Sequence, residues 1–134
     1  MKHFGLILVD KPTGPTSHKI VSIIRRETGV RKVGHAGTLD PRASGVLILC
    51  LGAATRLSEY LSTASKRYEA VIRFGESTKT YDAEGDSIRI TGAVPTEEDI
   101  QAIIPEFTGQ IEQIPPPYSA IKIKCKIAYE LARK

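Results

Sequence analysis

Two short apolar runs stand out in the first 51 positions of the chain. They cover residues 4–9 (FGLILV) and residues 46–51 (VLILCL). Short apolar runs bounded by glycine, proline or charged residues are typical of strands that are shielded from water. We therefore expect a buried strand at each position, and we expect the second to be buried on both faces.

A helix is predicted between these strands. Ser17 can cap its amino end, with Thr16 as a second candidate for the cap. Gly29 suits its carboxyl end because glycine readily adopts the left-handed conformation that stops a helix. The preceding residues 10–17 (DKPTGPTS) contain two prolines and a glycine and are predicted to form a loop. The residues at helical spacing are Ile20, Ile23, Ile24 and Glu27.

The middle of the chain changes from a helical pattern to an alternating one. A short helix is predicted over residues 54–61 and a half-exposed strand over residues 66–74. DAEGD at 82–86 is predicted to turn the chain into a partner strand at 87–90. The inward face of the alternating strand is expected to carry Tyr68, Ala70, Ile72 and Phe74.

Another helix is expected after Thr96, where Asp99 can complete a capping box, and Gly109 should end it. Residues 115–124 (PPPYSAIKIK) are predicted to form a rigid turn that leads into a strand, and residues 127–134 have helical composition. The buried stripe of the helix is expected to be Ile100, Ile103, Ile104 and Phe107.

Strands joined by tight turns, with a few helices between them, indicate an α+β fold with a largely antiparallel mixed sheet and flanking helices. The chain has 134 residues and 41% hydrophobic content, enough for one core. No apolar run is long enough to cross a bilayer, and the first one is too short for the core of a signal peptide. We therefore expect a cytoplasmic protein.

Basic residues outnumber acidic residues by 19 to 15, which gives a net charge of +4. This excess is compatible with a polyanionic partner, and equally with ordinary solvated faces of helices and strands. The basic residues gather as Arg25, Arg26, Arg31 and Lys32, then Lys66 and Arg67, then Lys122, Lys124 and Lys126.

Cysteine and histidine residues are too scattered for a metal site or a disulfide framework. Cys50 and Cys125 lie far apart, and neither belongs to a cluster with zinc-ligand spacing. The three histidines are equally dispersed. We therefore expect that side chains with oxygen or nitrogen atoms carry out any reaction, without a metal.

Residues 32–45 (KVGHAGTLDPRASG) are predicted to form a glycine-rich loop that leads directly into the second strand. Its glycines permit close approach of a ligand, although such loops are also ordinary turns. Pro41 biases the preceding Asp40 toward an extended conformation. Taken singly, each candidate residue has an ordinary structural explanation. Asp40 could be a turn residue, His35 could be a hydrogen-bonded loop residue, and Tyr68 could be a core residue with its hydroxyl at the edge.

Four strings, in this order and at these intervals, together resemble one enzyme family. They are DKPTGPTS (10–17), GHAGTLDPRASGVL (34–47), KRYEAVIRFGESTKTYDAEG (66–85) and PPPYSAIK (115–122). The chain resembles the TruB-type tRNA pseudouridine synthases, which isomerise uridine 55 in the T-loop of transfer RNA. The resemblance implies a pseudouridine synthase catalytic-domain fold, with residues 1–134 as its N-terminal portion and with the C-terminal catalytic portion and any RNA-binding domain absent.

The resemblance also implies roles for individual residues. Asp40 would be the catalytic carboxylate in a dry, shaped pocket, Tyr68 would point inward and stack on the uracil, and His35 would lie beside the flipped nucleotide. The implied partner is the T-stem-loop of tRNA, whose phosphates the basic clusters would contact, and no cofactor or metal is implied. Implied supporting residues are Lys11, Pro12, Gly34, Gly37, Thr38, Leu39, Thr80, Asp82 and Tyr118.

The sequence departs from the family pattern in two ways that affect the activity expected of this chain. Cys125 stands where the family usually has glycine, and the family's catalytic domain continues beyond the equivalent of residue 134. The downstream part of the family carries an arginine that pairs with the catalytic aspartate and so orients it. We therefore expect the 134-residue chain alone to be inactive or nearly so.

Two other functions fit parts of the sequence. A non-catalytic RNA-binding or RNA-folding module could keep the same framework, and it would bind a T-arm without isomerising it. Alternatively, DKPTGPTS could bind phosphate in an unrelated enzyme. That string lacks the Gly-Lys-Ser/Thr ending of a P-loop, and its prolines remove amide donors, which disfavours this alternative.

Overall fold

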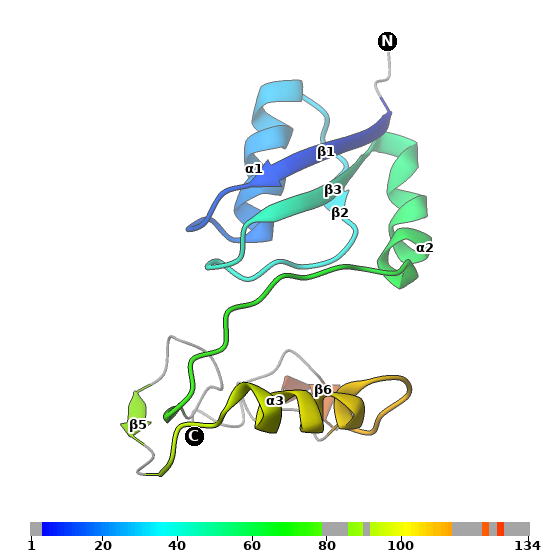
Figure 1. The fold of residues 1–134 in the computed structure, drawn as a ribbon. Helices are drawn as coiled ribbons and strands as arrows, with labels where there is room; N and C mark the ends of the chain where they lie inside the picture. Colours follow the sequence, from blue (N-terminus) through cyan, green and yellow to red (C-terminus); the bar gives the residue numbers. More distant parts are fainter. Residues whose placement is uncertain (1–3, 79–85, 90–91, 114–121, 124–125, 128–134) are drawn as a thin grey trace. The chain divides into compact units, whose positions relative to one another are not determined.

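The structure is a computed structural model that describes residues 4–78, 86–89, 92–113, 122–123 and 126–127. The chain divides into two compact units, Met1–Tyr68 (unit 1) and Glu69–Lys134 (unit 2). Unit 1 contains a three-stranded sheet flanked by helices (Figure 1).

The sheet of unit 1 is antiparallel throughout. Its strands are β1 (Gly5–Lys11), β2 (Val33–His35) and β3 (Gly45–Leu51), arranged in the order β1-β3-β2. Both strands predicted in this half are confirmed, and β1 extends through Lys11 into the predicted loop. The prediction that residues 32–45 form only a loop is wrong at Val33–His35, since pairing with β3 provides the backbone hydrogen bonds that make this glycine-containing segment a strand.

Helix α1 (Ser17–Thr28) follows β1 and confirms the helix predicted from the isoleucine spacing. Its amino-terminal cap is Thr16, whose hydroxyl oxygen accepts the amide of Lys19 at 3.1 Å. The prediction that Ser17 is the cap is therefore wrong, because Ser17 is already the first helical residue. Gly29 ends the helix with a φ of 66°, as predicted.

The core of unit 1 lies between α1 and one face of the sheet. The opposite face is exposed over much of its area, with Leu8 70% and Val46 68% accessible, so burial of β3 on both faces is confirmed only toward its carboxyl end. The buried apolar cluster consists of Ile20, Val21, Val33, Leu47, Leu49 and Leu51.

The chain continues from β3 into the 3-10 helix η1 (Gly52–Leu57) and helix α2 (Ser58–Thr63). These elements confirm the helix predicted over residues 54–61, with an earlier start and a later end. Figure 1 shows α1 and α2 on different sides of the sheet. Cys50, near the end of β3, exposes none of its surface.

Unit 2 contains a two-stranded sheet of β4 (Glu76–Thr78) and β5 (Ser87–Arg89). The strand predicted over residues 66–74 is wrong: this segment has no strand conformation, and both Val71 (98% accessible) and Ile72 (74%) are exposed. An alternating pattern makes a strand only when a neighbouring strand satisfies its backbone, and β5 pairs with β4 instead.

Helix α3 (Glu97–Ile103) and the 3-10 helix η2 (Ile104–Phe107) follow in unit 2. The capping box is confirmed, because Thr96 and Asp99 exchange side-chain-to-backbone hydrogen bonds. The backbone bond from Thr96, supported by its hydroxyl, holds the pKa of Asp99 below its ordinary value.

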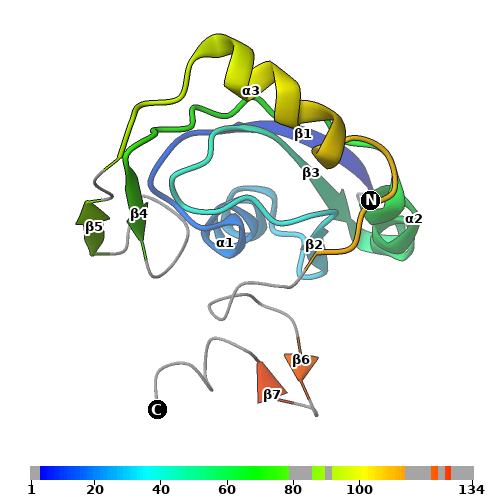
Figure 2. The ribbon, with the colours of Figure 1, turned by 60° about the horizontal axis from the view of Figure 1, so that its bottom comes forward.

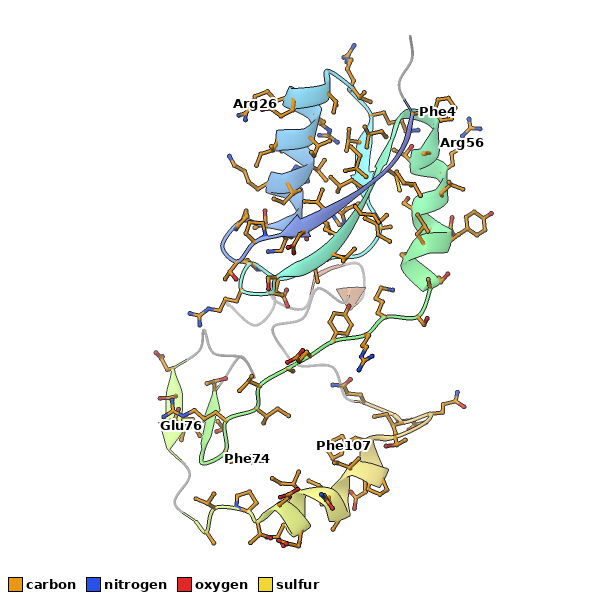
Figure 3. The ribbon with its side chains drawn as sticks, turned by 45° about the horizontal axis from the view of Figure 1, so that its top comes forward. Phe4, Arg26, Arg56, Phe74, Glu76 and Phe107 are labelled. Carbon is orange, nitrogen blue, oxygen red and sulfur yellow. The ribbon has the colours of Figure 1, made fainter. Side chains whose placement is uncertain are left out.

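The apolar stripe predicted for this helix is not buried. Ile104 and Phe107 are 53% and 70% accessible, and no residue of α3 is buried, because the described part of unit 2 provides no layer over this helix (Figure 3).

The final strands are β6 (Lys122–Ile123) and β7 (Lys126–Ile127), which pair with each other. β6 confirms the strand predicted to end residues 115–124, whereas β7 contradicts the helix at Ile127; residues 128–134 lie outside the described part.

Replacing Leu49, which has no accessible surface, by alanine should lower the free energy of unfolding of unit 1 by about 2–5 kcal/mol, because the core loses apolar contacts and gains a cavity. The control Leu8→Ala lies on the exposed face and should cost less than about 1 kcal/mol. Urea denaturation followed by circular dichroism measures both. Equal losses would contradict the assignment of the two sheet faces.

Candidate active site

Two loops meet at one end of the sheet in unit 1. Because Lys11 at the end of β1 lies opposite Gly45 at the start of β3, the loop after β1 and the loop before β3 leave the sheet side by side (Figure 1, Figure 2). The amide of Gly14 donates a hydrogen bond to the carbonyl of Pro41 at 2.7 Å and joins the loops directly. This junction brings together the first two motif strings of the sequence.

Lys11 forms the second link between these loops from inside the unit. Its side chain has no accessible surface, and its Nζ donates to the carbonyl oxygens of Pro12 (3.0 Å), Pro15 (2.9 Å) and Pro41 (3.4 Å). An ammonium group has three donors and no acceptor, so these three carbonyls use its full hydrogen-bonding capacity. Lys11 is therefore placed to brace the loops, and Pro12 contributes through its carbonyl group.

Ser17 forms a third link, from the first turn of α1. Its Oγ donates to the carbonyl of Leu39 and accepts the amide of Leu39, both at 2.9 Å. Ser17 is 2% accessible, and Leu39 packs against the apolar core. The main chain immediately before Asp40 is thereby attached to the helix.

Asp40 lies between these fixed points. The amide of Ala43 donates to the Asp40 carbonyl at 3.1 Å, which makes residues 40–43 a turn with Pro41 in its second position. The Asp40 side chain itself is exposed. The expected dry pocket is therefore wrong for unit 1 as described, because a carboxylate at a loop tip is enclosed only when further segments fold over it.

His35, the last residue of β2, is half-buried, and its Nδ1 lies 2.6 Å from the carbonyl oxygen of Gly37. A carbonyl oxygen only accepts, so this contact assigns the ring hydrogen to Nδ1 and leaves Nε2 as an acceptor in the neutral ring. Gly37 has a φ of 106°, a conformation that side chains rarely adopt. A Cβ there would also lie 3.7 Å from Cε of Lys66.

Tyr68 is the last residue of unit 1, and its side chain is 69% accessible. The expectation that its ring points inward from a strand is wrong, because the segment around it is not paired in a sheet. An exposed tyrosine ring retains a free face on which a base can stack. Its predicted role as a stacking platform stays a prediction.

The remaining predicted supporting residues receive mixed placements. Thr38 is exposed in the loop between β2 and β3. Gly34 pairs with Cys50 in the sheet, and nothing lies within 4 Å of the position that a Cβ would take there. The structure therefore gives no backbone or steric reason for glycine at that position. Thr80, Asp82 and Tyr118 lie outside the described residues.

The first basic cluster is partly structural. Arg25 Nη2 donates to the carbonyl of Val33 at 2.8 Å and ties α1 to β2, while Arg26 pairs with its neighbour Glu27 at 2.8 Å. Figure 3 shows Arg26 on α1 and Arg56 on η1, both directed away from the sheet. The phosphate contacts expected of the basic clusters stay predictions.

No group of three or more histidine, cysteine or carboxylate residues could hold a metal ion within the part of the chain that the structure describes. Burial raises the pKa of the Cys50 thiol, which disfavours the reactive thiolate form. Across the same described ranges, no helix combines the length and the apolar character that a membrane crossing requires.

Comparison with known proteins gives a consistent set of relatives. Residues 25–134 match the TruB family pseudouridylate synthase (N terminal domain). tRNA pseudouridine synthase B of Geobacillus thermodenitrificans (strain NG80-2) is 49% identical over 131 residues, which cover 96% of this chain and 43% of that protein. The protein of the same name from Arthrobacter sp. (strain FB24) is 52% identical over 130 residues, 96% of this chain and 42% of that protein. The chain thus spans less than half the length of these relatives.

Solved structures show the same similarity in three dimensions. A chain of the archaeal box H/ACA sRNP Nop10-Cbf5 complex is 36% identical, with a TM-score of 0.57, over 82% of this chain and 30% of that one. An H/ACA RNP bound to a substrate RNA containing 2'-deoxyuridine gives the same identity and TM-score over 82% of this chain and 29% of that one. These matches confirm the predicted fold class.

Replacing Lys11 by methionine should lower the free energy of unfolding of unit 1 by about 2–4 kcal/mol. The variant keeps the volume of the stem but leaves three proline carbonyls without their charged donor. Lys66→Met is the matched control, since Lys66 Nζ also donates to carbonyls, those of Ser62 and Ala64, but on an exposed surface. The control should cost less than about 0.5 kcal/mol in the same urea titration. Similar costs for the two variants would show that Lys11 does not brace the loops.

Proposed function

Because this chain belongs to the TruB family of pseudouridylate synthases, we propose that it carries the catalytic aspartate of an enzyme that converts uridine 55 in the T-loop of tRNA to pseudouridine. The observation that supports the proposal most is the placement of Asp40. Its main chain is held on both sides, at Leu39 by Ser17 and at Pro41 by Gly14 and Lys11, while its side chain is exposed to a substrate.

The proposed reaction is an isomerisation that balances without a redox step. The bond between ribose C1′ and uracil N1 breaks, the base turns within the site, and C1′ bonds to C5. The C5 proton leaves, and N1 gains a proton. No nucleotide cofactor and no metal is required, and a single carboxylate suffices because uracil is a better leaving group than a sugar alcohol.

In this proposal, Asp40 acts on the sugar or the base directly. A carboxylate can stabilise or trap positive charge at C1′, attack C6, or take part in an elimination that removes a ribose proton. Each route requires the carboxylate to be held at a defined position relative to the nucleotide. The hydrogen bonds that hold the main chain at residues 39 and 41 help to keep the Asp40 carboxylate at such a position.

The target uridine is stacked inside a folded RNA loop, so the enzyme must extrude it before reaction. Tyr68 is the proposed aromatic platform for the extruded uracil and the residue that helps remove the C5 proton. His35 is the proposed neighbour of the flipped nucleotide, with Nε2 as a hydrogen-bond acceptor. A tRNA substrate agrees with the predicted cytoplasmic location.

The curated relatives are more than twice as long as this chain, and the activity of a whole enzyme is proposed here on their pattern. We propose that residues 1–134 supply the framework around Asp40, and that sequence equivalent to the remainder of these relatives completes the site. On this proposal the 134-residue polypeptide alone is inactive or nearly so, as expected from the sequence.

A chimera that joins residues 1–134 to the remainder of the Geobacillus thermodenitrificans relative should release tritium from 5-tritiated uridine 55 of a T-stem-loop RNA. Asp40→Asn should reduce the release rate by about a thousandfold or more, because an amide cannot replace the carboxylate at the reacting atoms. Glu59→Gln removes an exposed carboxylate from α2 in the same unit and should leave the rate unchanged.

Two controls complete this experiment. A T-stem-loop labelled only at another uridine of the loop should release no tritium, and release from it would contradict position 55 as the target. Equal release by the chimera and its Asp40→Asn variant would exclude Asp40 as the catalytic residue. Binding of the RNA by the chimera without any release would favour the non-catalytic RNA-binding module instead.

A further inference from the structure

Resting on the proposed role of Asp40, we propose that Ser17 is a positioning residue for the reaction, which sets the orientation of the peptide bond between Leu39 and Asp40. The side chain of Ser17 contacts neither the reacting carboxylate nor, on this proposal, the RNA. It acts only through its two hydrogen bonds to the main chain of Leu39.

The hydroxyl group of Ser17 is available for this task because another residue caps the helix. Thr16 accepts the amide of Lys19, which is the usual task of a serine or threonine at a helix start. Ser17, one position later, is 2% accessible and reaches a residue 22 positions away in the sequence. The two adjacent hydroxyl groups therefore form different contacts: that of Thr16 caps the helix, and that of Ser17 joins the helix to the loop.

The two bonds of Ser17 restrict Leu39 more than a single contact would. The Leu39 amide belongs to the peptide group before this residue, and the Leu39 carbonyl belongs to the peptide group that joins it to Asp40. One hydroxyl oxygen at 2.9 Å from both atoms fixes the relative orientation of these two groups. The backbone direction from which the Asp40 side chain leaves is then set by the first turn of α1.

The far side of Asp40 is held by different residues. The Pro41 carbonyl accepts from the amide of Gly14 and from Nζ of Lys11. Since Pro41 also restricts its own φ, the backbone around Asp40 has little freedom left once Leu39 is held. The side chain of Asp40 can still rotate, and a residue that reacts with a bulky substrate needs this freedom to reach it.

The first test measures the link in the 134-residue chain, without any activity. Amide hydrogen exchange should show the Leu39 amide protected in the native protein. In Ser17→Ala, its protection should fall at least tenfold further than that of the Val21 amide, which lies in the buried part of α1 and reports general destabilisation. Thr16→Ala, which destabilises the whole unit, should lower the protection of the Leu39 and Val21 amides by the same factor and so leave their ratio unchanged. Equal loss at Leu39 and Val21 in Ser17→Ala would overturn the proposal.

The second test uses the chimera and its T-stem-loop substrate. Ser17→Ala should lower kcat by tenfold to a hundredfold and change KM by less than about twofold, because the carboxylate is misplaced while the RNA contacts remain. Ser17→Cys should resemble Ser17→Ala, since a thiol fills the space but forms weak hydrogen bonds. Thr16→Ala, with a comparable loss of thermal stability, should keep both constants within about twofold.

The outcomes separate this inference from the proposed function. Wild-type kcat in Ser17→Cys or Ser17→Ala would overturn the positioning role. The same losses of kcat in Ser17→Ala and Thr16→Ala would also overturn it, because they would reflect general destabilisation. If the unmodified chimera does not isomerise uridine, the proposed function fails, and the exchange at Leu39 still shows whether Ser17 holds the loop.

Discussion

The buried ammonium group of Lys11 is the interaction on which the candidate site depends. Placing an ammonium group where water cannot reach it is unfavourable unless every donor finds a partner. Here the partners are three carbonyls of proline residues, two in the loop after β1 and one in the loop before β3. The need to satisfy one buried cation therefore holds together two segments that are about 30 positions apart.

This arrangement separates the rigidity of the backbone from the exposure of the side chain. Asp40 is flanked by Leu39 and Pro41, and both neighbours are held by residues of the first loop or the first turn of α1. Its carboxylate nevertheless stays exposed. A catalytic group that must meet a nucleotide extruded from a folded RNA needs both properties, because a large substrate requires access and the reaction requires a defined position.

Two wrong predictions, the strand at residues 66–74 and the buried stripe of the helix after Thr96, share one physical cause. Residues 66–74 and the consecutive helices α3 and η2 have apolar patterns of the right period. A period only says which side chains share a face, and burial requires another element to cover that face. Ile72 and Phe107 remain exposed for this reason. Conversely, Val33–His35 lacks a strong strand pattern and becomes a strand because β3 offers it a partner.

The sequence by itself determined the features that depend on neighbouring residues: β1, β3, α1 with its stop at Gly29, and the capping box of Thr96 and Asp99. Its motif strings also pointed to the family and to Asp40. Only the tertiary structure decided that Thr16 rather than Ser17 caps α1, that Lys11 is buried, and that the Ser17 hydroxyl holds Leu39. The bonds of Lys11 to Pro41 and of Ser17 to Leu39 join residues that are distant in the chain. Local propensity carries no information about which of two adjacent hydroxyl groups will meet a loop 22 residues away, and the neighbouring hydroxyl group of Thr16 then caps the helix.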